Sequence, residues 1–386
     1  MHTFNSRPSL PQRGRNKQKR ADLRQVSLAL VVDEEQGLPL YYRCYEGNTP
    51  DVVALGASLK GMLGPFCPQH ASPQLTLILD KGNVSRDNFT ALSKAHFSFL
   101  AAIPAGWVRQ RSQGSLKASQ PLARPDGRRV KVSAQPQARL LGIEGKLLVS
   151  FSPRFYRRQV RTLDLLQRKA DQKLRTLQTT IQEAVARHRP RTEQAVRREM
   201  GRARRHDRRK NFCSPTLQLH HGAVEARRWE WDRRKKGAIK HGTLGRTVLC
   251  TDRRELSDHR IVVAYRSQAK VEEMFRISKS RRPGLWWPAY HWTDSKLSVH
   301  ALYCFLALLL IRVVVLRLHE RHLALGVDLL LERLRGMQEA LVVYANGAAQ
   351  RVLTQRSPEQ EALFVALHLR PLAEQLGNTV LDLYTP

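Results

Sequence analysis

The chain has 386 residues, of which 42% are hydrophobic, so it is long enough for two domains, or for one large domain with an insertion, around a real core. Lys and Arg number 66 against 33 acidic residues, which gives a formal net charge of +33. Such an imbalance indicates a polyanionic partner, nucleic acid first and an anionic membrane second, and leaves a basic protein with solvated charges as the plain alternative.

The cysteines and the N-terminal residues restrict the class of protein further. Cys67 and His70 have a ligand-like spacing, but no second pair completes a zinc site. The N-terminus is polar and basic without an apolar core, so we predict no secretory signal. The five cysteines are scattered, odd in number and consistent with a reducing, intracellular setting. They are Cys44, Cys67, Cys213, Cys250 and Cys304.

After a basic segment at residues 1–25, the pattern of residues 26–103 predicts alternating strands and helices. Val26–Val32 and Leu38–Tyr45 are predicted to form an antiparallel hairpin. The elements that follow are a helix at Asp51–Leu63, a strand at Leu75–Leu79, a helix at Ser85–His96 and a strand at Phe97–Ile103. This order indicates a mixed α/β sheet.

Residues 104–246 differ in character and are predicted to be a basic insertion, with strand-like pieces followed by helices. Within it, Arg154–Lys210 carries 19 basic and 6 acidic residues. Apolar residues recur there at helical spacing, and Pro190 separates two predicted helices. The apolar positions are Leu163, Leu166, Leu174, Leu177, Ile181 and Val185. A membrane-surface helix is the alternative, but this seam lacks interfacial aromatics, so contact of the basic outer face with DNA phosphates is favoured.

The sheet pattern returns in residues 247–320. Thr247–Thr251 and Ile261–Tyr265 are predicted strands, followed by a helix over Tyr265–Lys279. A further helix at Ser295–Arg317 contains an uninterrupted apolar run of 11 residues, which is too short to span a bilayer and is typical of a buried core helix. Residues 321–386 are predicted to form a tail of shorter elements, with a helix near Glu359–His368.

Two carboxylates are candidates for chemistry. On a helix, Tyr265, Gln268, Glu272 and Lys279 fall within a sector of roughly 60°, so one carboxylate is framed by a phenol, an amide and an ammonium. Asp80 follows a predicted buried strand, where ligands gather in α/β sheets. Acids at such places can hold Mg²⁺ or Mn²⁺ for phosphodiester chemistry. The plain readings are a solvated helix face and, for Asp80, a turn residue.

Together with other segments, these residues resemble the DDE transposases of bacterial insertion sequences. The similarity is to the subgroup with a strand-rich insertion and a Tyr-x2-Arg-x3-Glu-x6-Lys signature, whose Arg position is Gln268 here. It covers nearly the whole chain. The other matching segments are Leu10–Arg20, Tyr45–Asp51, Leu77–Ser85, Arg282-Pro283 and the stretch from His291 to His300.

The resemblance implies an α/β fold with a ribonuclease H-like mixed sheet flanked by helices and interrupted by the insertion. Asp80 and Glu272 would be the second and third acids of a catalytic triad and would ligate Mg²⁺ or Mn²⁺. The implied partners are double-stranded DNA, both inverted-repeat ends and target DNA, and a second copy in a homodimer on paired ends. The expected location is the bacterial cytoplasm, in contact with the nucleoid and not with a membrane. The DNA-binding residues that we predict are Tyr265, Gln268, Arg276, Lys279, Arg197, Arg198, Arg204 and Arg205.

The chain departs from the family in its first acid, which belongs on a strand before the Leu10–Arg20 segment. That position would fall before Met1, and neither Asp22 nor Asp33 matches it. The family's N-terminal DNA-binding region is also missing, so we expect a truncated reading frame that lacks the first strand. Two readings stay open: a transposase that cleaves and transfers DNA strands, and a catalytically inactive remnant that only binds DNA. An unrelated RNA-binding protein is a weaker third reading without an aromatic RNA-binding motif.

Overall fold

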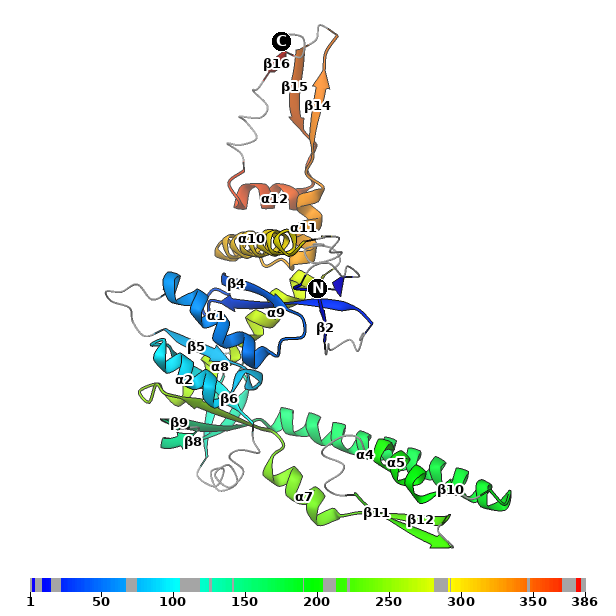
Figure 1. Cartoon of the computed structure of the whole chain (residues 1–386). Coiled ribbons are helices and arrows are strands. Elements are labelled where there is room, and N and C mark those ends of the chain that lie inside the picture. The colour runs from blue at the N-terminus through cyan, green and yellow to red at the C-terminus, as the bar shows by residue number, and fades with distance from the viewer. Residues whose placement is uncertain are drawn as a thin grey trace. The chain divides into compact units, whose positions relative to one another are not determined.

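The computed structural model gives two compact units, Met1–Pro73 with Arg266–Pro386 and Gln74–Tyr265, and each is described by itself (Figure 1). The structure describes residues 2–3, 9–14, 22–66, 75–104, 119–124, 127–140, 142–189, 191–203, 213–220, 223–280, 291, 293–345, 348–369 and 380–382.

The unit Gln74–Tyr265 is built on a six-stranded mixed sheet. Across the sheet the strands are β5 (Thr76–Leu79), β6 (Ser98–Ile103), β13 (Arg246–Thr251), β9 (Ile143–Phe151), β8 (Arg129–Leu140) and β7 (Gln120–Ala123). β5 and β6 are parallel and joined through the short 3₁₀ helix η1 (Lys81–Asn83) and α2 (Arg86–Lys94), whereas the other neighbours are antiparallel. The predicted α/β class, with a mixed sheet flanked by helices, is confirmed.

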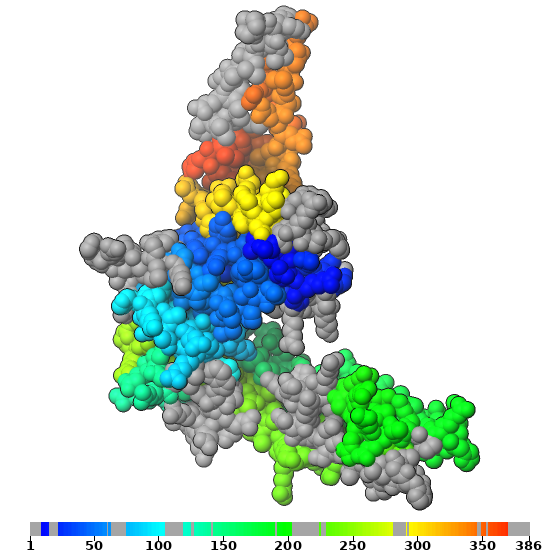
Figure 2. Space-filling model, viewed as in Figure 1, coloured from blue at the N-terminus to red at the C-terminus, as the bar shows by residue number. Residues whose placement is uncertain are grey.

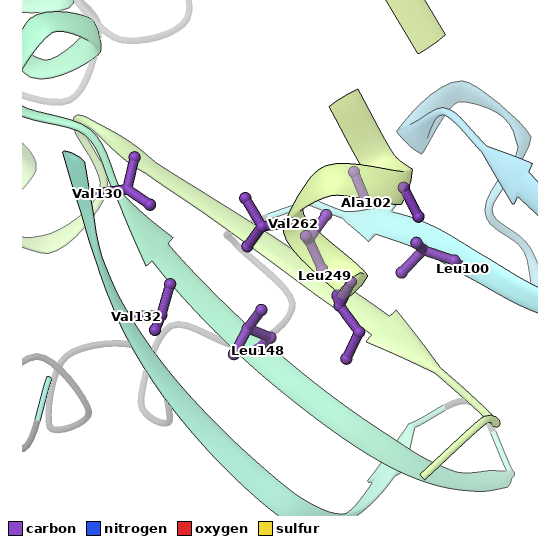
Figure 3. Close-up of a cluster of buried hydrophobic side chains, with 9 residues drawn as sticks. Leu100, Ala102, Val130, Val132, Leu148, Leu249 and Val262 are labelled. Atoms are coloured by element: carbon purple, nitrogen blue, oxygen red, sulfur yellow. The ribbon is translucent and has the colours of Figure 1, made fainter. Parts of the chain in front are cut away.

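A cluster of buried side chains joins this sheet to α8 (Asp258–Arg266), as Figure 3 shows. Its members are Leu100, Ala102, Val130, Val132, Leu148, Leu249, Ile261, Val262 and Ala264. The predicted strand at Ile261–Tyr265 is therefore wrong. The run is rich in β-branched residues, but its apolar face packs as a helix on the sheet, and this packing outweighs local strand propensity.

The basic part of the same unit is an arm of helices and strands. α4 (Pro153–Ala186) begins at Ser152, whose Oγ accepts a hydrogen bond from the Phe155 backbone N–H at 3.3 Å. α5 (Glu193–Ala203) follows after Pro190, so the predicted helical pair is confirmed. The remaining elements of the arm are β10 (Arg191–Thr192), β11 (Cys213–His220), β12 (Ala223–Trp231) and α7 (Arg233–Gly242). Buried residues of α4, α5 and β12 form its core.

The other unit contains the predicted hairpin, β3 (Arg24–Val32) with β4 (Pro39–Glu46), followed by α1 (Asp51–Phe66). The short strands β1 (His2–Thr3) and β2 (Gln12–Arg13) pair with one end of β3. The hairpin was predicted to share a sheet with the strands that follow it. Among the described residues it does not, because β5 pairs with β6 alone and the rest of β3 pairs with β4 alone.

Helices cover this hairpin. α9 (Gln268–Lys279) and α10 (Asp294–Glu320) pack on it, and the rings of Tyr42 and Phe305 stack with centroids 4.9 Å apart. The chain continues through α11 (Val327–Arg335), β14 (Glu339–Val343), β15 (Ala348–Leu353), α12 (Pro358–Ala366) and β16 (Val380–Asp382). The tail is thus a mixture of short elements, and its predicted helix is α12.

α10 differs from the predicted buried core helix. Leu297, Ala301 and Cys304 are buried toward the hairpin, but several large apolar side chains on another face are exposed. Among the described helices it is the one long and apolar enough to cross a membrane, and 22% of its most apolar window is buried. One face of α10 belongs to the core and the opposite face does not.

Candidate nucleic-acid interface

Asp80 lies where the sequence predicts, directly after β5 at the carboxyl end of the strand. It precedes the helical turn η1, and its backbone carbonyl accepts a hydrogen bond from Asn83 at 3.0 Å. The side chain is exposed and does not cap η1. The carboxylate therefore has the position and freedom of a ligand, while its backbone makes the turn that the plain reading expected.

Glu272 lies on α9 in the other unit, and its side chain is exposed. Met274 and Ile277 hold the opposite side of α9 against Leu308. Gln268 and Lys279 share the exposed side with Glu272, since offsets of 4 and 11 residues keep all three within roughly 40°. The Lys279 ammonium lies 5.4 Å from the centre of the Phe275 ring, and Arg276 forms an ion pair with Glu273 at 3.9 Å.

Tyr265 does not share this helix, so the predicted continuous helix from Tyr265 to Lys279 is wrong. α8 ends at Arg266 and α9 begins at Gln268, with Ser267 between them. The Tyr265 side chain is half-buried and packs against the buried cluster of the six-stranded sheet. The boundary between the two units also falls after Tyr265. The ring thus has a packing role that helical spacing did not reveal.

The outer face of α4 carries a row of four arginines that we call the α4 arginine row: Arg154, Arg157, Arg161 and Arg168. All four are exposed, and none forms an ion pair with a described residue. At 100° per residue they fall within a sector of about 60° and extend over about 21 Å of helix. The buried residues of α4 lie on the opposite side, so the helix is anchored by one face and presents the other.

The sequence placed these arginines in a basic helix, but did not single them out. The predicted residues of the segment were Arg197, Arg198, Arg204 and Arg205. Arg197 and Arg198 are exposed on α5, and Arg197 forms an ion pair with Glu193 at 2.5 Å. Arg204 and Arg205 lie outside the described residues. The signal that could have found the α4 arginine row is the recurrence of Arg at helical spacing opposite the leucine seam.

Polar contacts fix α4 against the rest of the arm. Asp171 Oδ1 accepts hydrogen bonds from the indole N–H groups of Trp229 at 2.6 Å and Trp231 at 2.9 Å. Lys236 of α7 forms an ion pair with Asp164 at 2.8 Å. The hydrogen bond from Lys236 is the largest cause of a lowered pKa at Asp164, and burial acts against it. Asp164 and Asp171 thus fix α4 to α7 and β12, while Arg168, one turn from each of them, adds to the lowering of the Asp164 pKa.

The described cysteines do not form a reactive site. Cys44, Cys250 and Cys304 are thiols that form no disulfide, and the Cys304 sulfur lies 3.6 Å from His300 Nε2. Burial raises the pKa of the Cys250 thiol to about 12, so it stays protonated at neutral pH. No group of three or more His, Cys, Asp or Glu side chains among the described residues is placed to hold a metal ion. Cys67 and His70 lie outside the described residues.

Comparison of the chain with protein-family models and with curated proteins finds no match. The arrangement of its own residues therefore carries the functional argument.

Proposed function

We propose that this protein binds double-stranded DNA through the outer face of α4 and α5. The observation that carries the proposal is the α4 arginine row, four exposed arginines in one line that form no ion pair with a described residue. Duplex DNA presents a continuous line of phosphates, and Arg makes bidentate contacts with phosphate oxygens. A straight helix anchored on its inner side holds such a row at fixed spacing.

The structure favours DNA over the two other polyanions considered. A membrane-surface helix needs an apolar face toward the lipid, but the apolar face of α4 is buried against α5 and β12. Single-stranded RNA is recognised by stacking on exposed aromatic rings, whereas Trp229 and Trp231 of this arm pack on its core and bond to Asp171.

The proposal is tested by the salt dependence of DNA binding. Replacing the α4 arginine row by Gln should lower the slope of log K against log salt by about 3.6, since each lost phosphate contact contributes about 0.9. The matched control replaces four exposed basic residues elsewhere in the same unit by Gln: Arg86, Lys94, Arg129 and Lys131. Fluorescence anisotropy with a labelled duplex gives both slopes. Equal slopes for the two variants would show that α4 does not contact the phosphates.

Beyond DNA binding, we propose that the protein is a ribonuclease H-like transposase that cleaves and transfers DNA strands at insertion-sequence ends. Support comes from the mixed sheet, from the β5–α2–β6 crossover and from Asp80 at the carboxyl end of β5. Asp80 and Glu272 would hold Mg²⁺ or Mn²⁺, and both are exposed carboxylates of the hard-oxygen type that these ions prefer. Such ions activate the attacking oxygen and stabilise the leaving oxygen.

Gln268 and Lys279 would then contact the phosphate backbone near Glu272, because they share its side of α9. Tyr265 has a weaker case, since its ring packs on the sheet. A nicking assay with Mg²⁺ or Mn²⁺ on DNA with terminal inverted repeats tests the activity. Glu272→Gln and Asp80→Asn should each abolish nicking and leave binding unchanged.

The second candidate is a protein that binds DNA without cutting it. It is favoured by the observation that Asp80 and Glu272 are two carboxylates where three are expected, and that they belong to different units. Tight, salt-sensitive binding together with no metal-dependent nicking by the unmutated chain would decide for this candidate.

A further inference from the structure

The exposed side of α10 is an apolar stripe, which we define by Val299, Tyr303, Leu306, Leu310 and Val313. Between 39% and 67% of each of these side chains is exposed. Leu302 lies beside the stripe and is 39% exposed. The buried residues of the same helix, such as Ala301 and Leu308, lie on the opposite side. Figure 2 shows this part of the chain, in yellow, at the surface.

The spacing within the stripe has the period of two helices that coil around one another. Successive members are separated by 4, 3, 4 and 3 residues, which is the a/d pattern of a heptad repeat. Over about 21 Å of helix, this pattern keeps one narrow seam pointed at a partner helix. A helix that met a flat lipid surface would not need such a seam.

The area of the stripe is large enough to form the core of an interface. The five residues of the stripe and the adjacent Leu302 expose on the order of 500 Å². This equals the largest apolar patch of a typical monomer, and such patches are often functional. A standard protein interface buries about 800 Å² on each partner. The stripe and its polar margins can therefore supply the core of such an interface.

We propose that α10 pairs with α10 of a second copy of this chain, antiparallel and related by a two-fold axis at Leu306. In this register Leu306 faces Leu306, Tyr303 faces Leu310, and Val299 faces Val313. The stripe is thus complementary to itself, as a two-fold interface requires. The inference does not rest on DNA binding, because no residue of α4 or α5 takes part.

The helix dipoles favour the antiparallel arrangement. Lys296 lies one turn before the stripe, and Arg317 lies after it. An antiparallel pair about Leu306 brings Lys296 beside Arg317 of the partner, but it aligns the two helix dipoles in opposite directions, which is favourable. A parallel pair would also set like charges together, Lys296 against Lys296 and Arg317 against Arg317, and its parallel dipoles would repel.

Sedimentation of the full chain without DNA, at a salt concentration that screens surface charges, tests the pairing. We expect the unmutated chain to be dimeric at concentrations of about 1–50 μM. The double variant Leu306→Glu with Leu310→Glu should raise the dissociation constant of the dimer at least about 100-fold. The matched control is Val53→Glu, which puts the same charge on an apolar residue of α1 that is 60% exposed. It should leave the dimer intact, and both variants should keep the circular dichroism and the DNA binding of the unmutated chain.

Cysteine cross-linking tests the orientation. Leu306→Cys should cross-link to itself, and a mixture of Val299→Cys with Val313→Cys should cross-link where neither variant does alone, with the unmutated chain as the background. A monomeric unmutated chain, or a double variant that stays dimeric, would overturn the proposal. Flotation with phosphatidylcholine vesicles identifies lipid as the alternative partner. If the unmutated chain floats with the vesicles and Leu306→Glu does not, lipid covers the stripe and the proposal is overturned.

Discussion

The two longest helices of the described chain, α4 and α10, bury one apolar face in the same manner and differ in the other. α4 has 34 residues and α10 has 27, and each has completely buried side chains along its inner side. The outer side of α4 carries the arginine row, whereas the outer side of α10 carries the apolar stripe.

The difference shows that the inner face of a helix determines where it docks, and the outer face determines what it can bind. Both helices are explained as parts of the fold by their inner faces alone. Their outer faces need different partners, a polyanion for α4 and an apolar helix for α10. The comparison is strongest if each outer face can be altered without affecting the other.

The largest expected effect is the loss of DNA binding when the α4 arginine row is replaced by Glu. Four phosphate contacts disappear and four repulsive charges replace them, so affinity for a duplex should fall by more than about 10³-fold at low salt. For the unmutated chain, neutralising about eight phosphates predicts a fall of roughly 10³–10⁵-fold between 50 and 200 mM salt. Fluorescence anisotropy measures both effects.

The same Glu variant should keep the association of the α10 stripes, because none of its changes touches α10. If the variant lost DNA binding and dimer together, the two outer faces would not be independent. If it still bound DNA, the basic surface would lie elsewhere in the chain.

The next effect is on stability and distinguishes the two faces within each helix. Leu174→Ala on α4 should lower the free energy of unfolding by about 2–5 kcal/mol, since Leu174 is completely buried. Leu165→Ala on the same helix should cost less than about 0.5 kcal/mol. On α10, Leu308→Ala is the buried counterpart, at 1% exposure, and Leu310→Ala the exposed one, at 65%.

Chemical denaturation at two protein concentrations separates the outcomes. Leu310→Ala should be harmless in dilute solution and destabilising in concentrated solution, where the stripe is paired, whereas Leu165→Ala should be harmless in both. A loss of stability for Leu310→Ala that does not depend on concentration would place that side chain against its own chain.

Much of the fold could be predicted from the sequence, because period and turn signals determined it locally. The hairpin, the strands β5 and β6 and the helix α10 occur within a few residues of their predicted bounds, and α4 ends before Pro190 as predicted. The failures arose where distant contacts decide. Ile261–Tyr265 has strand propensity but packs as a helix on the sheet, and Ser267 interrupts a helix whose spacing looked continuous.

The candidate site was predictable to a similar extent. Asp80 at the end of a strand and Glu272 on a helix face lie where their local patterns indicated. What the sequence could not give is exposure: it did not show that Tyr265 is half-buried, that the α4 arginine row is exposed, or that α10 has an open face. Exposure depends on which elements meet, and a single sequence does not record that.

A smaller effect is expected at Asp171, which holds the inner side of α4. Asp171→Ala would remove the acceptor of two indole hydrogen bonds, and a buried polar group that loses its hydrogen bond costs about 1–3 kcal/mol. Asp171→Asn keeps an acceptor oxygen and should cost less. Thermal unfolding followed by tryptophan fluorescence should rank the variants in this order. An equal loss for both would mean that the charge of Asp171, and not its hydrogen bonds, matters.

The smallest effect is a pH dependence of the contact between α4 and α7. The pKa of Asp164 is lowered, chiefly by its hydrogen bond with Lys236, so this carboxylate stabilises the folded arm above its unfolded pKa of about 3.9. That contribution is lost as the pH falls through the lower folded value. Because Asp164 is 36% exposed, its contribution to the unfolding free energy should stay below about 1 kcal/mol.

The measurement compares the unmutated chain with Lys236→Met. Their difference in unfolding free energy should be constant from about pH 7 to pH 5 and shrink below pH 4. The control is Lys235→Met, which alters a neighbouring lysine that is 63% exposed. It should change the unfolding free energy at neutral pH by less than Lys236→Met does. Equal changes for the two variants would show that the α4–α7 contact has no special role.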